Sequence, residues 1–155
     1  MVRASILAAV LLCAAAWTES DTAGAPIVLS NEKPAGSFPV SAATVNSAPA
    51  AVDISVTRVS NPDETALGFY VYLEASAVDN QAAPRVLVGN FSLYPADRPA
   101  GFMLPVAGAL DNLKGQSRSM KGVRLILEMR RLHGDAPWKE VEVTIAPPHW
   151  RVQSK

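Results

Sequence analysis

The stretch LGFYVYLEASAVDNQAAPRVLVGNFSLYP, from Leu67 to Pro95, decides the fold. It contains two β-rich apolar runs on either side of a polar turn region at 79–84. In each run the side chains alternate between two faces with a period of two, and many of them are aromatic or β-branched. This pattern is typical of β-strands. The two runs are therefore predicted to form a hairpin at the centre of an antiparallel sheet.

The alternation also assigns the side chains of this hairpin to faces. On the first strand, one face is predicted to carry Phe69, Val71 and Leu73, and the other Tyr70, Tyr72 and Glu74. On the second strand, Leu87, Gly89, Phe91 and Leu93 are expected to share a face opposite Val86, Val88, Asn90 and Ser92. Phe91 is thus predicted to lie between two sheets.

The rest of the chain predicts an all-β protein. Period-two alternation recurs at 52–57, 123–130 and 140–145, and 27–29 is consistent with a short edge strand. One short helix is expected at 106–114, because Val106, Leu110 and Leu113 fall on one helical face and Gly115 is a suitable stop. Several short strands with one helix indicate an antiparallel β-sandwich, jelly-roll-like, or a barrel. We expect the sandwich.

The first residues have the pattern of a secretory signal peptide. Arg3 provides a positive charge, an apolar run follows from Ile6, and Ala14 and Ala16 form a small-x-small pair before Trp17. The alternative is a buried N-terminal helix. The sequence therefore predicts a signal peptide at 1–16, a Pro/Ala/Ser-rich extended arm at 17–49 and one β-sandwich domain at 50–155. The mature protein is expected to be secreted or periplasmic.

Removal of the signal would also change charge and cysteine content. The whole chain has 155 residues with 14 basic and 14 acidic side chains, and its one cysteine is Cys13. The expected mature chain loses Cys13 and Arg3, so it has no cysteine and a net charge of about −1. Leu12 stands where a lipoprotein signal has a small residue, which argues against lipidation of Cys13. This charge favours neither nucleic acid nor an anionic membrane as a partner.

The residue types give little support for catalysis. The chain has two histidines, His133 and His149, and lacks the HExxH and CxxC patterns, so we expect no metal site, although His133 with Met129 could suggest copper. There is no GxSxG motif for a Ser/His/Asp hydrolase, and the pair Glu140 and Glu142 is expected to be solvated. Asn90-Phe91-Ser92 fits a glycosylation acceptor but lies inside a predicted strand. We expect no catalytic residue and no cofactor.

Two apolar segments are candidate contacts with a partner protein. Phe102, Met103 and Leu104 follow a loop with proline and glycine, and Trp150 follows the diproline at 147–148. The alternatives are that the first segment is a short core strand and that Trp150 packs back onto the domain, because large apolar side chains are usually buried.

The order of five sequence blocks resembles a known domain family. The blocks are GFYVYL, VGNFSLYP, FMLPVAGALDNL, VRLILEM and VEVTI, between Val52 and Ile145. They resemble the KFDV-type C-terminal β-domain of tyrosinases and polyphenol oxidases. Departures include Tyr70 in place of an acidic residue and Asn90 in place of serine. A type-3 copper centre needs six histidines, and this chain has two.

The resemblance implies a non-catalytic module that acts by protein–protein binding. In that family the domain covers the entrance of the copper site, so an exported tyrosinase-like copper oxidase is the implied partner. Two other functions stay open on the residues. A carbohydrate-binding or surface sandwich would need exposed aromatic side chains in one plane, and a small secreted hydrolase would need a pocket with a hydrogen-bonded histidine.

Overall fold

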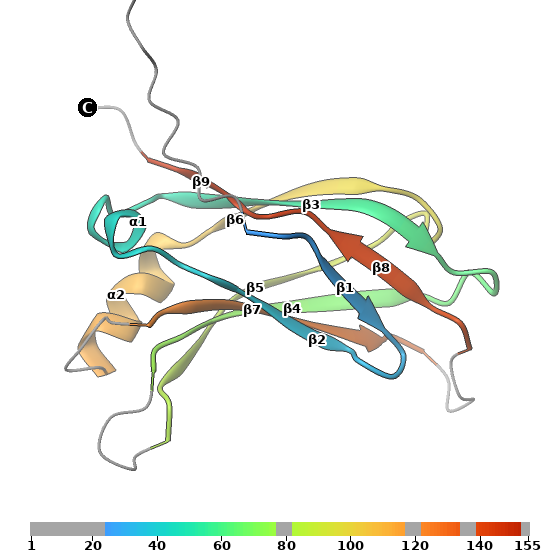
Figure 1. Cartoon of the computed structure of the whole chain (residues 1–155), viewed down its shortest axis with the longest axis horizontal. Coiled ribbons are helices and arrows are strands. Elements are labelled where there is room, and N and C mark those ends of the chain that lie inside the picture. The colour runs from blue at the N-terminus through green and yellow to red at the C-terminus, as the bar shows by residue number, and fades with distance from the viewer. Residues whose placement is uncertain (1–23, 77–81, 117–121, 134–138, 153–155) are drawn as a thin grey trace, which may run out of the picture.

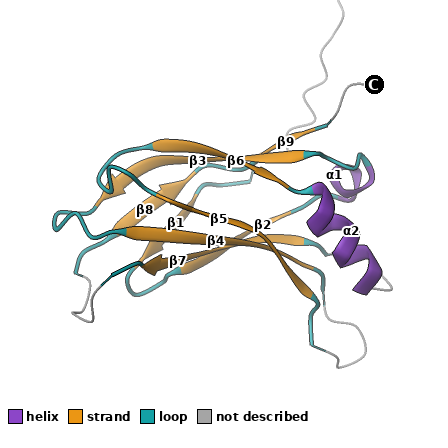
Figure 2. Ribbon diagram, turned by 180° about the vertical axis from the view of Figure 1, so that it is seen from behind, coloured by secondary structure: helices purple, strands orange, loops and turns teal. Residues whose placement is uncertain are grey.

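The computed structural model describes residues 24–76, 82–116, 122–133 and 139–152 (Figure 1). The predicted signal peptide at 1–16, with Cys13, lies outside these ranges, as does the first part of the predicted arm. The described residues form two antiparallel sheets stacked face to face, with the two helices at one end (Figures 1 and 2). The predicted all-β sandwich is therefore confirmed.

One sheet has five strands and the other four, and four strands of each follow a jelly-roll order. The upper sheet of Figure 1, called sheet A here, has the order β1-β8-β3-β6, with the short β9 also paired to β3. Its strands are β1 (Ile27–Ser30), β8 (Glu142–Ile145), β3 (Ala51–Ser60), β6 (Ala100–Pro105) and β9 (His149–Arg151). The lower sheet, sheet B, has the order β2-β7-β4-β5. Its strands are β2 (Ala35–Pro39), β7 (Arg124–Arg131), β4 (Leu67–Glu74) and β5 (Arg85–Ser92).

The inner faces of the sheets form one continuous core. Phe69, Val71 and Leu73 of β4 are fully buried, as the period-two pattern predicts. Phe91 of β5 is buried as predicted, and its ring stacks on Phe69 with 4.9 Å between centroids. On its other side it stacks on Phe102 of β6 at 4.0 Å. Because β5 and β6 belong to different sheets, this stack joins the two layers.

A β-bulge changes the predicted faces of β5. Val71 pairs with Gly89, but the next residue of β4, Tyr72, pairs with Leu87, so Val88 is extra. An extra residue reverses the alternation beyond it. Leu87 is therefore 49% exposed and lies on the outer face, so its predicted place beside Phe91 is wrong. The hairpin is also off-centre in its sheet, because β5 is an edge strand and only β4 is central.

The segment predicted to be an extended arm belongs largely to the sandwich. β1 pairs with β8 at one edge of sheet A, and β2 pairs with β7 at one edge of sheet B. Between β2 and β3 lies α1 (Ala42–Asn46), whose first turn is capped by the Ser41 hydroxyl accepting from the Thr44 amide. The predicted boundary at residue 50 is therefore wrong. β1 corresponds to the short edge strand predicted at 27–29. β2, with the sequence AGSFP, has one large apolar side chain, which is too few for a period to be recognised.

The predicted helix corresponds to α2 (Ala107–Gln116). Leu110 and Leu113 are buried on its inner face, and Val106 is buried just before it. The helix ends at Gln116, one residue beyond Gly115, where it was predicted to stop. Its inner face covers the end of the core near β4 and β5 (Figure 2).

Substitution of Phe91 tests the stack that joins the sheets. Phe91→Ala should lower the free energy of unfolding by about 3–5 kcal/mol, because a large buried ring leaves a cavity between two others. Urea denaturation measures this loss. The control Leu87→Ala, from the exposed face of the same strand, should cost less than about 1 kcal/mol. A loss below about 1 kcal/mol for Phe91→Ala would contradict the packing described here.

Candidate functional site

The predicted contact segment at 102–104 is strand β6, and its side chains point to opposite faces. Leu104 is buried, and Phe102 is half-buried against Phe91. Met103 is 62% exposed on the outer face of sheet A, next to Asp53 in the strand register. Of this segment, Met103 is therefore the residue that a partner could reach without rearrangement of the core.

Trp150, the other predicted contact, lies in β9 and packs on the core. Its register partner is Val52, and its side chain is half-buried. His149 and Arg151, on either side of Trp150 in the chain, lie on the outer face. There the Asp53 carboxylate accepts a 2.6 Å hydrogen bond from Arg151 Nε. His149 Nδ1 lies 3.5 Å from the same carboxylate. This ionic contact fastens the C-terminal strand to β3, and the Arg151 guanidinium holds the pKa of Asp53 below its usual value.

The pH dependence of stability tests this contact. The pKa of Asp53 is lower in the folded protein than its ordinary 3.8, so its stabilising effect is present above that value and is lost as the pH falls below it. From about pH 5 to about pH 3, the melting temperature should fall further for wild type than for Asp53→Asn. The control Asp111→Asn, on the exposed face of α2, should keep the wild-type pH dependence. Identical profiles for wild type and Asp53→Asn would contradict the assignment.

A buried asparagine fixes the loops at the end of the sandwich opposite the helices. Asn61 is 5% exposed, and no other polar or charged residue in the described part of the chain is buried. Its amide donates 2.9 Å hydrogen bonds to the carbonyls of Thr65 and Ala96, and its oxygen accepts from the Thr65 amide at 3.0 Å. One side chain thus ties the β3–β4 loop to the β5–β6 loop. Both loops lie at the end of the sandwich opposite the helices (Figure 1).

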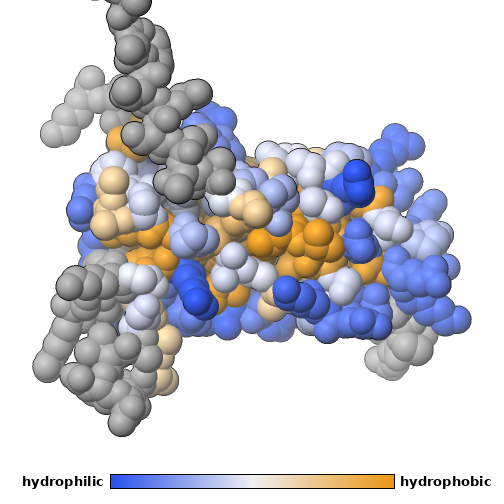
Figure 3. All heavy atoms as spheres, viewed as in Figure 1, coloured by the Kyte–Doolittle hydropathy of each residue, from blue (hydrophilic) through white to orange (hydrophobic). Residues whose placement is uncertain are grey.

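Tyr94 stands on the second of these fixed loops and is 95% exposed. Asp63, Glu64, Asp97 and Arg98 are exposed on the same two loops. Figure 3 shows that this end of the molecule is mainly hydrophilic. We call Tyr94 and these four charged residues the loop-end surface. The sequence contains no local signal for the hydrogen bonds of Asn61 or for the exposure of Tyr94.

The role of Asn61 can be tested by stability. Asn61→Ala removes three hydrogen bonds and leaves partly buried backbone groups of both loops without these partners, which should cost about 1–3 kcal/mol. Thermal or urea unfolding measures the change. Asn112→Ala, on the exposed side of α2, is the matched control and should be within about 0.5 kcal/mol of wild type. An equally small effect at Asn61 would show that its hydrogen bonds do not hold the loops.

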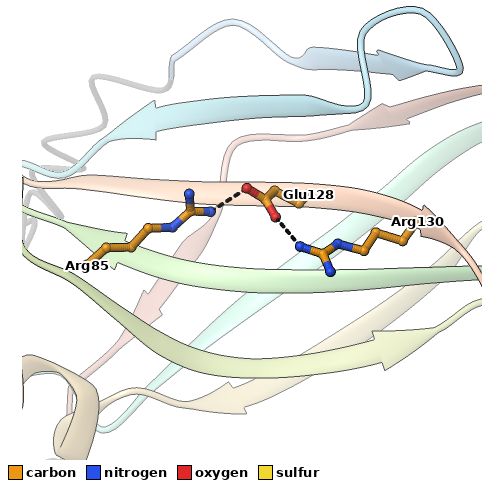
Figure 4. A network of polar contacts seen from close by, with 3 residues as sticks. All are labelled: Arg85, Glu128 and Arg130. Carbon is orange, nitrogen blue, oxygen red and sulfur yellow. Dashed lines mark hydrogen bonds and ion pairs between the residues drawn. The ribbon is translucent and has the colours of Figure 1, made fainter.

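The outer face of sheet B carries a connected set of aromatic and charged side chains. The Arg85 guanidinium lies over the Tyr72 ring, 3.9 Å from its centroid, and the Arg130 guanidinium lies 4.8 Å from the centroid of Tyr70. Glu128 lies between the two arginines, with Oε1 2.6 Å from Arg85 and Oε2 3.0 Å from Arg130 (Figure 4). We call these five residues the arginine–tyrosine ladder.

The ladder follows from strand pairing. Tyr70 pairs with Glu128, and Tyr72 lies two residues further along β4 on the same face. Arg85 approaches from β5 and Arg130 from β7. The hydrogen bond from Arg85, and to a smaller extent the one from Arg130, lowers the pKa of Glu128. Its carboxylate therefore stays ionised at neutral pH. The sequence predicted the outward faces of Tyr70 and Tyr72 but not their arginine partners, which come from other strands.

Both histidines lie on the open surface of the described part of the chain. His133 is exposed beyond β7, and His149 lies on an open strand surface with a 77% exposed side chain. Within the described ranges, His149 has no hydrogen bond to a serine or threonine hydroxyl, and no three His, Cys, Asp or Glu side chains are grouped to hold a metal ion. Two open depressions of about 310 and 350 Å³ lie near Met129 and Glu142, and neither histidine lines them.

Comparisons with known proteins add no assignment. The chain matches no protein-family model, and a search of curated proteins returns no similar sequence. Within the described residues, no helix is both long enough and apolar enough to cross a membrane.

Proposed function

We propose that this protein is a non-catalytic binding module that docks onto another exported protein. The resemblance to the C-terminal domain of tyrosinases and polyphenol oxidases makes a tyrosinase-like copper oxidase the candidate partner. In this proposal the module covers or supports the oxidase near its substrate entrance. The observation that carries the proposal is Tyr94, an aromatic side chain that is 95% exposed on a loop fixed by Asn61.

An exposed aromatic residue on a fixed loop is well suited to anchor a protein interface. Tyrosine supplies a large contact area with few torsion angles to immobilise, so little conformational entropy is lost on binding. Asn61 fixes the neighbouring backbone before any partner arrives, which lowers the ordering cost further. Interfaces usually depend on one or two such side chains in a desolvated pocket of the partner.

The charges around Tyr94 favour a basic partner surface. The loop-end surface has three carboxylates, Asp63, Glu64 and Asp97, against one guanidinium, Arg98. A pocket that receives Tyr94 should therefore have a positively charged rim. Association should weaken with increasing salt, because exposed charges at an interface edge are screened.

Binding to a purified oxidase tests the proposal. The probe is a tyrosinase-like copper oxidase that has no C-terminal β-domain of its own, and affinity is measured by titration calorimetry. Tyr94→Ser should weaken binding by about 2 kcal/mol or more and leave the melting temperature nearly unchanged. Failure of the wild type to bind this oxidase at micromolar concentration would contradict the proposal.

Two controls distinguish the loop-end surface from the segment predicted from the sequence. Met103→Ser changes the exposed residue of β6, so a loss of affinity there would move the contact to the outer face of sheet A. Phe102→Ser should lower the melting temperature markedly, because its ring stacks on Phe91. Any loss of binding in that variant would then follow from unfolding.

A further inference from the structure

The arginine–tyrosine ladder has more cationic hydrogen-bonding capacity than its own carboxylate uses. The Glu128 carboxylate accepts one hydrogen bond from a terminal nitrogen of each arginine, at 2.6 Å from Arg85 and 3.0 Å from Arg130. Each guanidinium has five N–H donors in a planar fork that matches a carboxylate. Two guanidinium groups share one carboxylate, so the ladder itself has a net charge of +1. Its unused donors suit a second, external carboxylate.

The side chains of the ladder are held in place before a ligand binds. Each guanidinium is stacked on a tyrosine ring and tied to Glu128, and the two rings come from one rigid strand in the middle of the sheet. Tyr70 and Tyr72 are two residues apart, which is about 7 Å along a strand. The side chains of Arg85 and Arg130 remain 33% and 57% exposed, so a ligand can reach them.

The shape of this face favours an extended, hydrated ligand over a protein surface. The large exposed apolar residues on the described part of this face are Leu87 and Leu132. Leu87, 49% exposed, adjoins Tyr72, and Leu132, 40% exposed, lies over Gly68. A protein interface usually has a broader apolar centre that excludes water. A sugar chain needs less: flat apolar surfaces for its C–H groups, and planar polar side chains at intervals. Leu87 offers an apolar surface beside the ladder, and the two guanidinium groups are the planar polar groups.

We propose that the arginine–tyrosine ladder binds a carboxylate-bearing polysaccharide, a polymer of uronic acid units, laid along the outer face of sheet B. Sugar rings contact Leu87 beside Tyr72, and uronate carboxylates pair with the N–H groups of Arg85 and Arg130 that Glu128 does not use. This surface is formed by strands and is distinct from the loop-end surface. The inference therefore does not depend on the proposed docking to an oxidase.

Affinity electrophoresis of the full chain in gels containing polygalacturonate tests the proposal. Polygalacturonate should retard the wild-type protein, and neutral dextran should not. The double variant Arg85→Gln/Arg130→Gln should lose at least tenfold in affinity. The control Arg58→Gln removes an exposed guanidinium from β3, a strand of sheet A, and should bind like wild type. Circular dichroism and melting curves establish that each variant is folded.

Several results would overturn the proposal. These are absence of retardation of the wild type, equal retardation by dextran, or an equal loss of affinity in Arg58→Gln and the double variant. If the double variant does not fold, the single variant Arg130→Gln replaces it, with the same expected direction. Loss of oxidase binding in the double variant, with polygalacturonate binding unchanged, would assign this face to protein docking instead.

Discussion

The stack of Phe69, Phe91 and Phe102 is the interaction on which the sandwich depends. Phe69 and Phe91 are neighbours in sheet B, and Phe102 comes from the facing sheet. The centroid distances of 4.9 and 4.0 Å leave no room between the rings for water. This contact fixes how β5 lies against β6 and therefore how the edges of the two sheets meet. It also explains why Phe102 points inward and Met103 outward.

The alternating pattern predicted the central strands well, because one face of each must be buried and the period is strict. Phe69, Val71 and Leu73 lie on the buried face of β4 as their spacing indicates. The pattern failed where an extra residue entered, at Val88, because a bulge depends on pairing between strands and has no local signal. It also missed β2, a five-residue strand with the sequence AGSFP, in which Phe38 is the buried side chain.

The candidate surfaces were less accessible to sequence reasoning than the fold. Outward faces for Tyr70 and Tyr72 follow from their spacing, but the guanidinium groups over them come from β5 and β7. The exposure of Tyr94 depends on the course of a loop held by Asn61, more than thirty positions earlier in the chain. Such features arise from contacts between residues far apart in the sequence, so periodicity and composition do not predict them.

The N-terminal strands have a consequence for how the chain folds. Ile27 pairs with Ile145, so the first strand of sheet A cannot find its partner until nearly the whole sequence is available. In the same way, β2 cannot pair until β7 is available. Pairings of such long sequence separation close large loops before they gain any contact energy, which places all-β domains of this kind among those that fold in milliseconds to seconds. Until then the apolar faces of β3 and β4 lack their covering strands, and the incomplete chain is most exposed to aggregation during that interval.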